Sequence, residues 1–306
     1  MPAIETRELT RRFKDKTAVD RITLTISEST IFGFLGPNGA GKTTTVRMLA
    51  GLISPTSGEA TVAGISLNGD LSKLRRSVGV LTESPGLYEQ LSAFQNLLFF
   101  GRLHGLSRSA AKSQIEKYLK LLELWDVRDE RAGTFSKGMR QKVAIARTLL
   151  HEPSVVFFDE PTSGLDPAAA RSLRDLIKSL RAEGRTIFLT THNLPEAEEL
   201  CDHIAIMKGS ILMVGAQNQV QSAQSRVRLT FTEPSERWVE RLRKNEFVTD
   251  LKANGFIVEF TVDDPGLRNP ELIRVLAAEG ARLYSAEVLR KSLEEVYLNL
   301  IGKQVA

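Results

Sequence analysis

A glycine-rich segment near the N-terminus has the spacing of a phosphate-binding loop. Residues 36–43 read G-P-N-G-A-G-K-T and match the pattern G-x-x-x-x-G-K-[ST]. Glycines let such a backbone turn tightly and direct its N–H groups inward as an anion nest. We expect Lys42 to reach the β- and γ-phosphates of a nucleotide and the Thr43 hydroxyl to bind Mg²⁺. The residues expected to hold the nucleotide here are Gly36, Pro37, Asn38, Gly39, Ala40, Gly41, Lys42, Thr43 and Thr44.

The residues on either side of this loop predict the elements that position it. The apolar run 31–35 is typical of a short buried strand, and residues 44–50 are typical of the start of a helix. A helix N-terminus carries about half a positive charge, which would point at the same anion. An ordinary glycine-rich turn is the alternative interpretation, and the combination of strand, loop and helix disfavours it.

Two acidic residues follow a second apolar run. Residues 155–158 show no alternation, which predicts a parallel strand buried on both faces, and Asp159 and Glu160 come directly after it. Ligand sites of parallel sheets lie at the carboxyl ends of the strands. We therefore expect Asp159 to hold Mg²⁺ and Glu160 to orient or deprotonate an attacking water. A strand that ends in acidic residues is weak evidence alone, but the phosphate-binding loop upstream strengthens it.

Two further segments fit the same kind of site. Ser136 and Gly138 precede an apolar pattern with helical spacing, which predicts a helix with a hydroxyl N-cap and an accessible N-terminus. His192 ends the apolar strand 186–192, and at the same sheet edge it would contact the γ-phosphate or the attacking water. A capped helix and a structural histidine are the alternatives when each segment is taken alone.

Length and composition limit the classes of protein. The chain has 306 residues, of which 42% are hydrophobic, enough for one large domain and a small one. No apolar run approaches the roughly 18 residues that a membrane helix needs, the N-terminus shows no signal-peptide core, and Cys201 is the only cysteine. We expect a protein of the reducing cytoplasm without a disulfide, in which Cys201 is buried. The net charge of +4 is too small to indicate nucleic-acid binding.

In their order, these motifs resemble the nucleotide-binding subunit of ATP-binding cassette (ABC) transporters. The family's phosphate-binding loop corresponds here to residues 36–43, its glutamine loop to the loop around Glu83, and its signature to residues 135–139. Its Walker B strand corresponds to residues 157–160, its D-loop to residues 163–166, and its switch histidine to His192. The resemblance implies an α/β fold of the P-loop NTPase type over residues 1–218. This domain would contain a RecA-like core, an antiparallel β subdomain and a helical subdomain at about residues 84–150.

The resemblance also implies how such a site works. Two copies would face each other head to tail and bind Mg²⁺ and ATP between them. Ser136 and Gly138 of one copy would contact the γ-phosphate held by the other, and Asp166 would link the two sites. A separate membrane permease would be the partner, on the cytoplasmic face of the cell membrane, and no nucleic acid is expected. ATP hydrolysis would then drive transport.

Several positions depart from the family pattern. Phe13 occupies the position of the usual adenine-stacking tyrosine, and a core or surface phenylalanine is the alternative interpretation. Glu83 stands where the family has glutamine, either as a Mg²⁺ contact or as a solvated loop carboxylate. In the signature, Lys137 replaces the first glycine and Met139 replaces glutamine, and we expect Lys137 to face water.

Four aromatic residues begin the expected helical subdomain, where the family receives a helix of the membrane partner. They are Tyr88, Phe94, Phe99 and Phe100. They fit a docking groove, but core packing explains them equally well, and we favour core packing for at least half of them.

Residues 219–306 predict a separate α+β domain after a polar linker at about residues 215–226. Strand, helix, hairpin, helix and strand signals follow one another, with the hairpin at Asn254-Gly255 and the helices at 235–244 and 270–279. This β-α-β-β-α-β order is that of a ferredoxin-like fold. A last helix is expected at 292–301. Exporter ATPases of the drug and polysaccharide type often carry comparable tails, so the resemblance favours an exporter.

Other functions remain as alternatives. A non-transport ABC ATPase acting on nucleic acid or ribosomes typically has two fused cassettes or long coiled coils, and the sequence shows neither. A GTPase would need an Asn-Lys-x-Asp motif, which is absent. A regulator that binds the nucleotide without turnover requires that Glu160 be inactive. The ATPase of a transporter, most consistent with export, is therefore the function that we expect.

Overall fold

The computed structural model describes residues 2–82, 84–217, 225–262, 264–289 and 292–302. Contacts divide the chain into two compact units, Met1–Val214 and Gly215–Ala306. Glu83 lies outside the described residues. So do residues 218–224, which contain the predicted domain boundary and much of the predicted linker. The described start of that linker, Gly215 and Ala216, still belongs to a strand.

A six-stranded sheet forms the centre of the first unit. Its strand order is β10-β9-β3-β8-β7-β6, and β9, β3, β8, β7 and β6 pair in parallel. The strands are β3 (Ile31–Leu35), β6 (Val78–Leu81), β7 (Val155–Asp159), β8 (Thr186–Thr191), β9 (His203–Lys208) and β10 (Ser210–Ala216). Every residue of β3, β7 and β8 is buried. For β3 and β7 this confirms the expectation from their apolar runs. Because these three neighbours run parallel, the loops that follow them meet at one edge.

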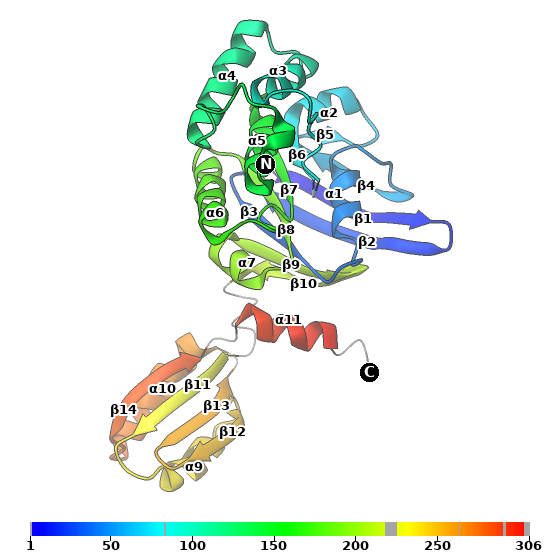
Figure 1. Ribbon diagram of the computed structural model, residues 1–306. Helices are drawn as coiled ribbons and strands as arrows, with labels where there is room; N and C mark the ends of the chain where they lie inside the picture. The colour runs from blue at the N-terminus through cyan, green and yellow to red at the C-terminus, as the bar shows by residue number, and fades with distance from the viewer. Residues whose placement is uncertain (1, 83, 218–224, 263, 290–291, 303–306) are drawn as a thin grey trace. The chain divides into compact units, whose positions relative to one another are not determined.

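Helices cover both faces of this sheet. In Figure 1, α6 (Pro167–Ala182) and α7 (Leu194–Leu200) lie on one side, and α1 (Lys42–Leu49) lies on the other. A short helix, α2 (Leu71–Ser77), leads into β6. Each of α1, α6 and α7 begins just after one of the strands β3, β7 and β8, so their N-termini gather at the carboxyl edge of the sheet.

An antiparallel sheet packs against α1. Its order is β2-β1-β4-β5, with β1 (Pro2–Phe13), β2 (Lys16–Ser27), β4 (Ser57–Val62) and β5 (Ile65–Ser66). Along β2, buried and exposed residues alternate, as expected for a strand with one face on a core. One hydrophobic cluster joins its Leu24 to Val46 of α1 and Phe157 of β7. The sheet thereby holds the β1–β2 turn, with Phe13 opposite Lys16, near the helix that follows the glycine-rich loop.

A helical subdomain lies between β6 and β7, inside the predicted range 84–150. It contains α3 (Ala93–Leu103), α4 (Arg108–Leu121), a 3₁₀ turn (Ala132–Thr134) and α5 (Lys137–Leu149). Serine caps each helix, namely Ser92 with a full capping box, Ser107 and Ser136. Among the described residues, no helix has the length and apolarity to cross a membrane. The predicted core, antiparallel sheet and helical subdomain are therefore all present.

The four aromatic residues of this subdomain correct our preference for core packing. Tyr88 is 52% exposed and Phe99 is 46% exposed, and Phe94 and Phe100 are only half-buried. Tyr88, Phe99 and Phe100 contact one another, with ring centroids 5.3–6.1 Å apart. The core-facing positions of α3 are taken instead by Ala93, Asn96, Leu97 and Gly101, at helical spacing. The aromatic side chains consequently cover an outer surface of the subdomain.

The second unit has the predicted order of elements. Its strands β11 (Ser225–Phe231), β12 (Thr249–Asn254), β13 (Ile257–Val262) and β14 (Leu283–Leu289) form a sheet of order β12-β13-β11-β14, antiparallel throughout. The helices α9 (Glu236–Arg243) and α10 (Pro265–Ala278) complete the β-α-β-β-α-β order of a ferredoxin-like fold, and α11 (Leu293–Gly302) follows. Trp238, 1% exposed, stacks on Phe231 within its core.

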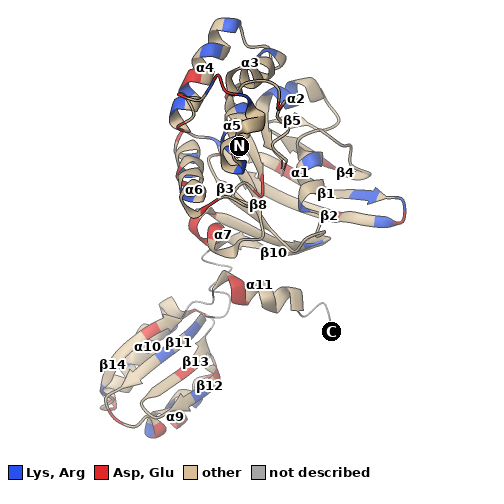
Figure 2. Ribbon diagram, viewed as in Figure 1, with Lys and Arg blue, Asp and Glu red and all other residues tan. Residues whose placement is uncertain are grey.

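The helix-free face of this second sheet is charged. Arg228 of β11 lies opposite Glu259 of β13 and contacts it at 2.7 Å, and Arg226 contacts Asp250 at 3.2 Å. Figure 2 shows basic segments on β11 next to an acidic segment on the neighbouring β13. One helix start is corrected here: α10 begins at Pro265 and not at Pro270, because Asp264 caps it by accepting a hydrogen bond from the Leu267 N–H.

Candidate functional site

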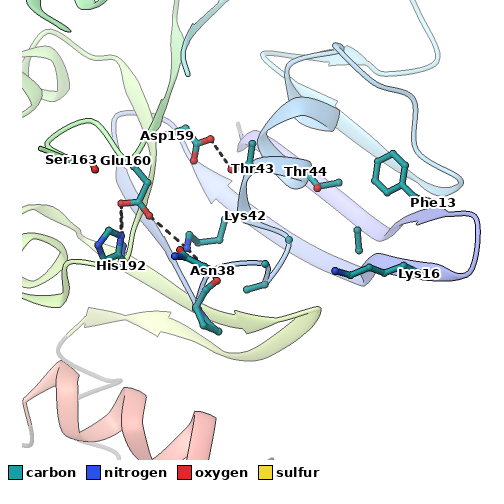
Figure 3. A pocket seen from close by; sticks show the side chains of 15 residues that line it. Phe13, Lys16, Asn38, Lys42, Thr43, Thr44, Asp159, Glu160, Ser163 and His192 are labelled. Atoms are coloured by element: carbon teal, nitrogen blue, oxygen red, sulfur yellow. Dashed lines mark hydrogen bonds and ion pairs between the residues drawn. The ribbon is translucent and has the colours of Figure 1, made fainter. Parts of the chain in front are cut away.

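A cavity of about 670 Å³ opens at the carboxyl edge of the parallel sheet (Figure 3). It gathers side chains that the sequence singled out from four separate regions of the chain. The predicted residues that line it are Phe13, Pro37, Asn38, Gly39, Ala40, Gly41, Lys42, Thr43, Thr44, Asp159, Glu160 and His192. Sequence reasoning missed Lys16 and Ala18, which also line it, and named Ser163, a further lining residue, only as the first residue of the D-loop. Lys16 and Ala18 carried no motif; only the β1–β2 turn brings them to the loop.

The glycine-rich loop needs glycine at two positions for different reasons. Gly39 and Gly41 have φ angles of +79° and +106°, which other residues rarely adopt. A Cβ at Gly41 would also collide with the Ala18 carbonyl oxygen. Gly41 is the N-cap of α1 and has no side chain to accept hydrogen bonds from the first N–H groups of the helix. Those donors and the helix dipole therefore suit an anion in the cavity.

Lys42 is held between the loop and the acidic side of the site. Its side chain is 7% exposed, and its Nζ donates to the Gly36 carbonyl oxygen at 2.7 Å. The same Nζ lies 3.6 Å from Glu160 Oε1. Gly36 itself does not line the cavity but contributes this carbonyl group. The ammonium group is thus fixed where phosphate oxygens of a nucleotide in the loop would meet it.

Asp159 and Thr43 form the part of the site that suits Mg²⁺. Asp159 is 2% exposed, Thr43 Oγ1 donates to its Oδ2 at 2.8 Å, and Thr190 Oγ1 donates to its Oδ1. Within the described part of the chain, no group of three or more histidine, cysteine or acidic residues could hold a metal by itself. Mg²⁺ is usually held by one or two protein oxygens together with phosphate and water oxygens. These two oxygen ligands fit that mode of binding, and Glu83 lies outside the described residues.

Glu160 has an unusual backbone conformation that the sequence did not predict. Its φ is +52°, in the left-handed region that costs a non-glycine residue about 1–3 kcal/mol. A hydrogen bond of 3.0 Å from its N–H to the Thr190 carbonyl oxygen fixes this turn. Glu160 Oε2 then lies 2.8 Å from His192 Nδ1 (Figure 3). Strain of this kind is common at active sites, where surrounding contacts enforce it.

Phe13 lies at the rim of the cavity. Its ring is 45% exposed, and the Arg11 guanidinium lies 4.5 Å from the ring centroid. An exposed ring next to the phosphate-binding loop offers a face on which a base can stack. The role of Phe13 in adenine binding therefore stays a prediction.

Besides Gly36, three further predicted residues lie outside the cavity. Ser136 Oγ accepts from the Met139 N–H at 3.2 Å and so caps α5, and Gly138 lies in the first turn of that helix. Asp166 caps α6 by accepting from the Ala168 and Ala169 N–H groups, and the bond from Ala169 is the main reason that the pKa of Asp166 is lowered. Ser136 and Asp166 are both exposed. Cys201 is buried as expected, and burial raises the pKa of its thiol.

The fold and this site define a P-loop nucleotide-binding protein, and comparisons with known proteins give its family. Residues 19–163 match the model of the family described as ABC transporter. The chain is 34% identical to the Bacillus subtilis protein named Uncharacterized ABC transporter ATP-binding protein YhcH, over 98% of this chain and 96% of the relative. It is also 34% identical to the Nod factor export ATP-binding protein I of Rhizobium sp. strain N33, over 99% and 98% of the two chains.

A solved structure agrees with this assignment. The dimeric structure of MJ0796, a bacterial ABC transporter cassette, superposes with a TM-score of 0.65 at 26% identity, and covers 70% of this chain and 98% of that one. This chain therefore belongs to the ABC transporter family, as an ATP-binding subunit. The α/β cassette fold predicted for the N-terminal part is confirmed, and so is the class of enzyme, an ATPase that powers transport.

Proposed function

We propose specific roles for the residues of the cavity in Mg²⁺-dependent ATP hydrolysis. Lys42 and the N–H groups of the loop bind the β- and γ-phosphates, and Phe13 stacks on the base. Thr43 and Asp159 hold Mg²⁺, which when bound would neutralise charge on the phosphate oxygens. Glu160 accepts the proton of the attacking water, and His192 orients that water and the γ-phosphate. The 2.8 Å contact between Glu160 and His192 at the mouth of the phosphate-binding loop is the main support for these roles.

We infer further that two copies of the chain complete each other's sites. The observation that supports this is the position of Ser136 and Gly138, at an exposed helix N-terminus that lies outside the chain's own cavity. Such a helix end favours an anion, and a nucleotide in a second copy would provide one. The dimeric cassette MJ0796, similar in fold, supports the same arrangement. Asp166, which caps α6 beside Leu165, would then lie at the contact between the copies.

A Gly138→Asp substitution should abolish this ATP-driven dimer without harming the fold. A Cβ at Gly138 would meet only Leu165 Cδ2 at 3.8 Å and Ser136 Oγ at 3.9 Å, which are ordinary contacts. The new carboxylate would repel the γ-phosphate of the partner copy. The test uses a Glu160→Gln background, which should hold ATP without turnover. In size-exclusion chromatography with Mg·ATP, the Glu160→Gln protein should elute as a dimer and the Glu160→Gln, Gly138→Asp double variant as a monomer. The affinity of each chain for ATP should differ by no more than about threefold between these two proteins. Equal dimer in both proteins would refute the role of the α5 N-terminus.

We propose also that the chain binds a separate membrane permease and powers export. Export is supported by the name of the Rhizobium relative, whose chain matches this one almost throughout. The docking surface that we propose lies beside the exposed aromatic residues of α3. There a cavity of about 230 Å³ is lined by Leu52, Phe100, Leu103, Arg75 and Arg147, with Leu103 70% exposed. The chain would accordingly be peripheral on the cytoplasmic face of the membrane.

A Leu103→Asp substitution should release the chain from its permease. The charge would enter an apolar contact at a position that is exposed in the free subunit, so the fold should not suffer. Leu121→Asp is a matched control, because Leu121 is 54% exposed and also ends a helix of the same subdomain. Co-purification with membranes from cells that express the complete transporter should fall at least about tenfold for Leu103→Asp only. Intact membrane binding of both variants would place the docking surface elsewhere.

A further inference from the structure

A buried carboxyl group lies next to the catalytic edge without lining the cavity. Glu196 is 2% exposed and belongs to the first turn of α7, shortly after His192. Burial raises the pKa of this carboxyl group, while the hydroxyl groups of Thr162 and Thr191 oppose the rise. A buried carboxyl group is costly unless such partners compensate it. The partners of Glu196 therefore indicate what the group does.

These partners belong to the two loops that carry the proposed catalytic pair. Thr191 Oγ1 donates a hydrogen bond of 2.9 Å to Glu196 Oε2, and Thr191 immediately precedes His192. Thr162, two residues after Glu160, also lowers the pKa of this carboxyl group, but the second carboxylate oxygen, Oε1, is buried without a hydrogen-bond partner in the described part of the chain. Glu196 thus holds the residue next to His192, the histidine of the Glu160–His192 contact.

Helix capping does not account for this arrangement. Glu196 occupies the third position of α7, where a capping box would direct its carboxylate back to the N–H of the cap residue, Asn193. In α3 the equivalent Gln95 does this, accepting from the Ser92 N–H at 2.9 Å. In α7 the Asn193 N–H donates instead to Thr191 Oγ1 at 3.0 Å. The carboxyl group of Glu196 instead accepts a hydrogen bond from Thr191, on the loop before the helix.

The loop after Glu160 is also held from the other side. Gln141 of α5 donates from its Nε2 to the Pro161 carbonyl oxygen at 3.0 Å, in a buried bond. The Ser163 N–H donates to the Glu160 carbonyl oxygen at 3.2 Å, which closes a tight turn. Loss of the Glu196 bond would therefore free Thr191 on the histidine loop while the contact of Gln141 kept the Glu160 loop in place.

We propose that Glu196 is a positioning residue that fixes the distance between Glu160 and His192 by holding Thr191, the residue before the histidine. The inference rests on the proposed roles of Glu160 and His192 in hydrolysis. A displacement of about 1 Å in such a pair can cost about 100-fold in rate. The binding of ATP, which depends on the loop at residues 36–43, should be little affected.

The test compares steady-state ATP hydrolysis by Glu196→Ala and Glu196→Gln. The alanine variant should lose about 10- to 100-fold in kcat with KM for ATP within about twofold. The glutamine variant should recover most of this loss, because its amide still accepts one hydroxyl hydrogen bond. Glu199→Ala is the matched control, since Glu199 lies on the same helix, is exposed and pairs with Lys178 and Arg174. Its kcat should be that of the parent.

Double variants separate positioning from a general structural role. On a His192→Ala background, Glu196→Ala should have little further effect on kcat, because the pair that it positions is already lost. Full additivity, an unchanged kcat for Glu196→Ala, or equal losses in kcat and ATP affinity would overturn the proposal. If Glu196→Ala does not fold, Thr191→Val decides, and a parental kcat for that variant would overturn the proposal. A Glu160→Gln protein with full activity would instead refute the proposed function itself.

Discussion

A Glu160→Gln protein should bind ATP as tightly as the parent and hydrolyse it at least about 100-fold more slowly. The amide keeps the size of the side chain but does not accept a proton from water. In the variant, the amide side chain at position 160 should still contact His192 Nδ1, as the carboxylate does in the parent, and the loop that holds the phosphates should be unchanged. Phosphate release measured under saturating Mg·ATP gives the rate, and titration calorimetry gives the affinity.

Glu152→Gln is the control for this experiment. Glu152 also has a φ of +52°, but its side chain is exposed and pairs with Lys117 at 3.5 Å, far from any role in the cavity. It should keep the parental rate. A Glu160→Gln enzyme with more than about a tenth of the parental kcat would rule out Glu160 as the general base. The ATP-bound dimer should also accumulate in the Glu160→Gln protein, because release of the partner depends on hydrolysis.

Lys42→Ala should weaken ATP binding by about 10- to 100-fold. The expected loss reflects charge-assisted hydrogen bonds to the β- and γ-phosphates, made in a site where the ammonium group is only 7% exposed. The phosphate-binding N–H groups of the loop would remain. In the free protein the substitution removes the bond to the Gly36 carbonyl oxygen, which water can replace. The affinity of ATP is measured by titration calorimetry without turnover, in the Glu160→Gln background.

Arg47→Ala provides the matched control for the change of charge. Arg47 lies on the same helix, α1, and is exposed, and it does not line the cavity. Its removal lowers the net charge equally and should leave the affinity for ATP within about twofold. An unchanged affinity for Lys42→Ala would contradict the role that we assign to the loop lysine. Loss of affinity in both variants would point to long-range electrostatics in place of direct contact.

The elements of the fold were largely predictable because each carries a local pattern. Apolar runs indicated β3 and β7, and Ser136 was recognisable as the cap of α5. The order of the second unit was also predictable, because turn signals such as Asn254-Gly255 separate its strands. The start of α10 was not, since both Pro265 and Pro270 fit the first turn of a helix and only the Asp264 cap decides between them. The aromatic residues of α3 were misjudged because burial depends on what packs against a helix.

The amino-acid sequence alone determined the phosphate-binding loop, the acidic residues after β7 and the histidine after β8, because each chemistry needs a residue type at a fixed spacing. The tertiary structure decided the rest. It brought Phe13 and Lys16 to the same cavity through the β1–β2 turn and forced Glu160 into a left-handed turn toward His192. It also turned Glu196 away from its own helix cap toward Thr191. These contacts join residues far apart in the chain or depend on backbone conformation, so no local sequence pattern predicts them. The parallel sheet determines them, because it brings three loops to one edge.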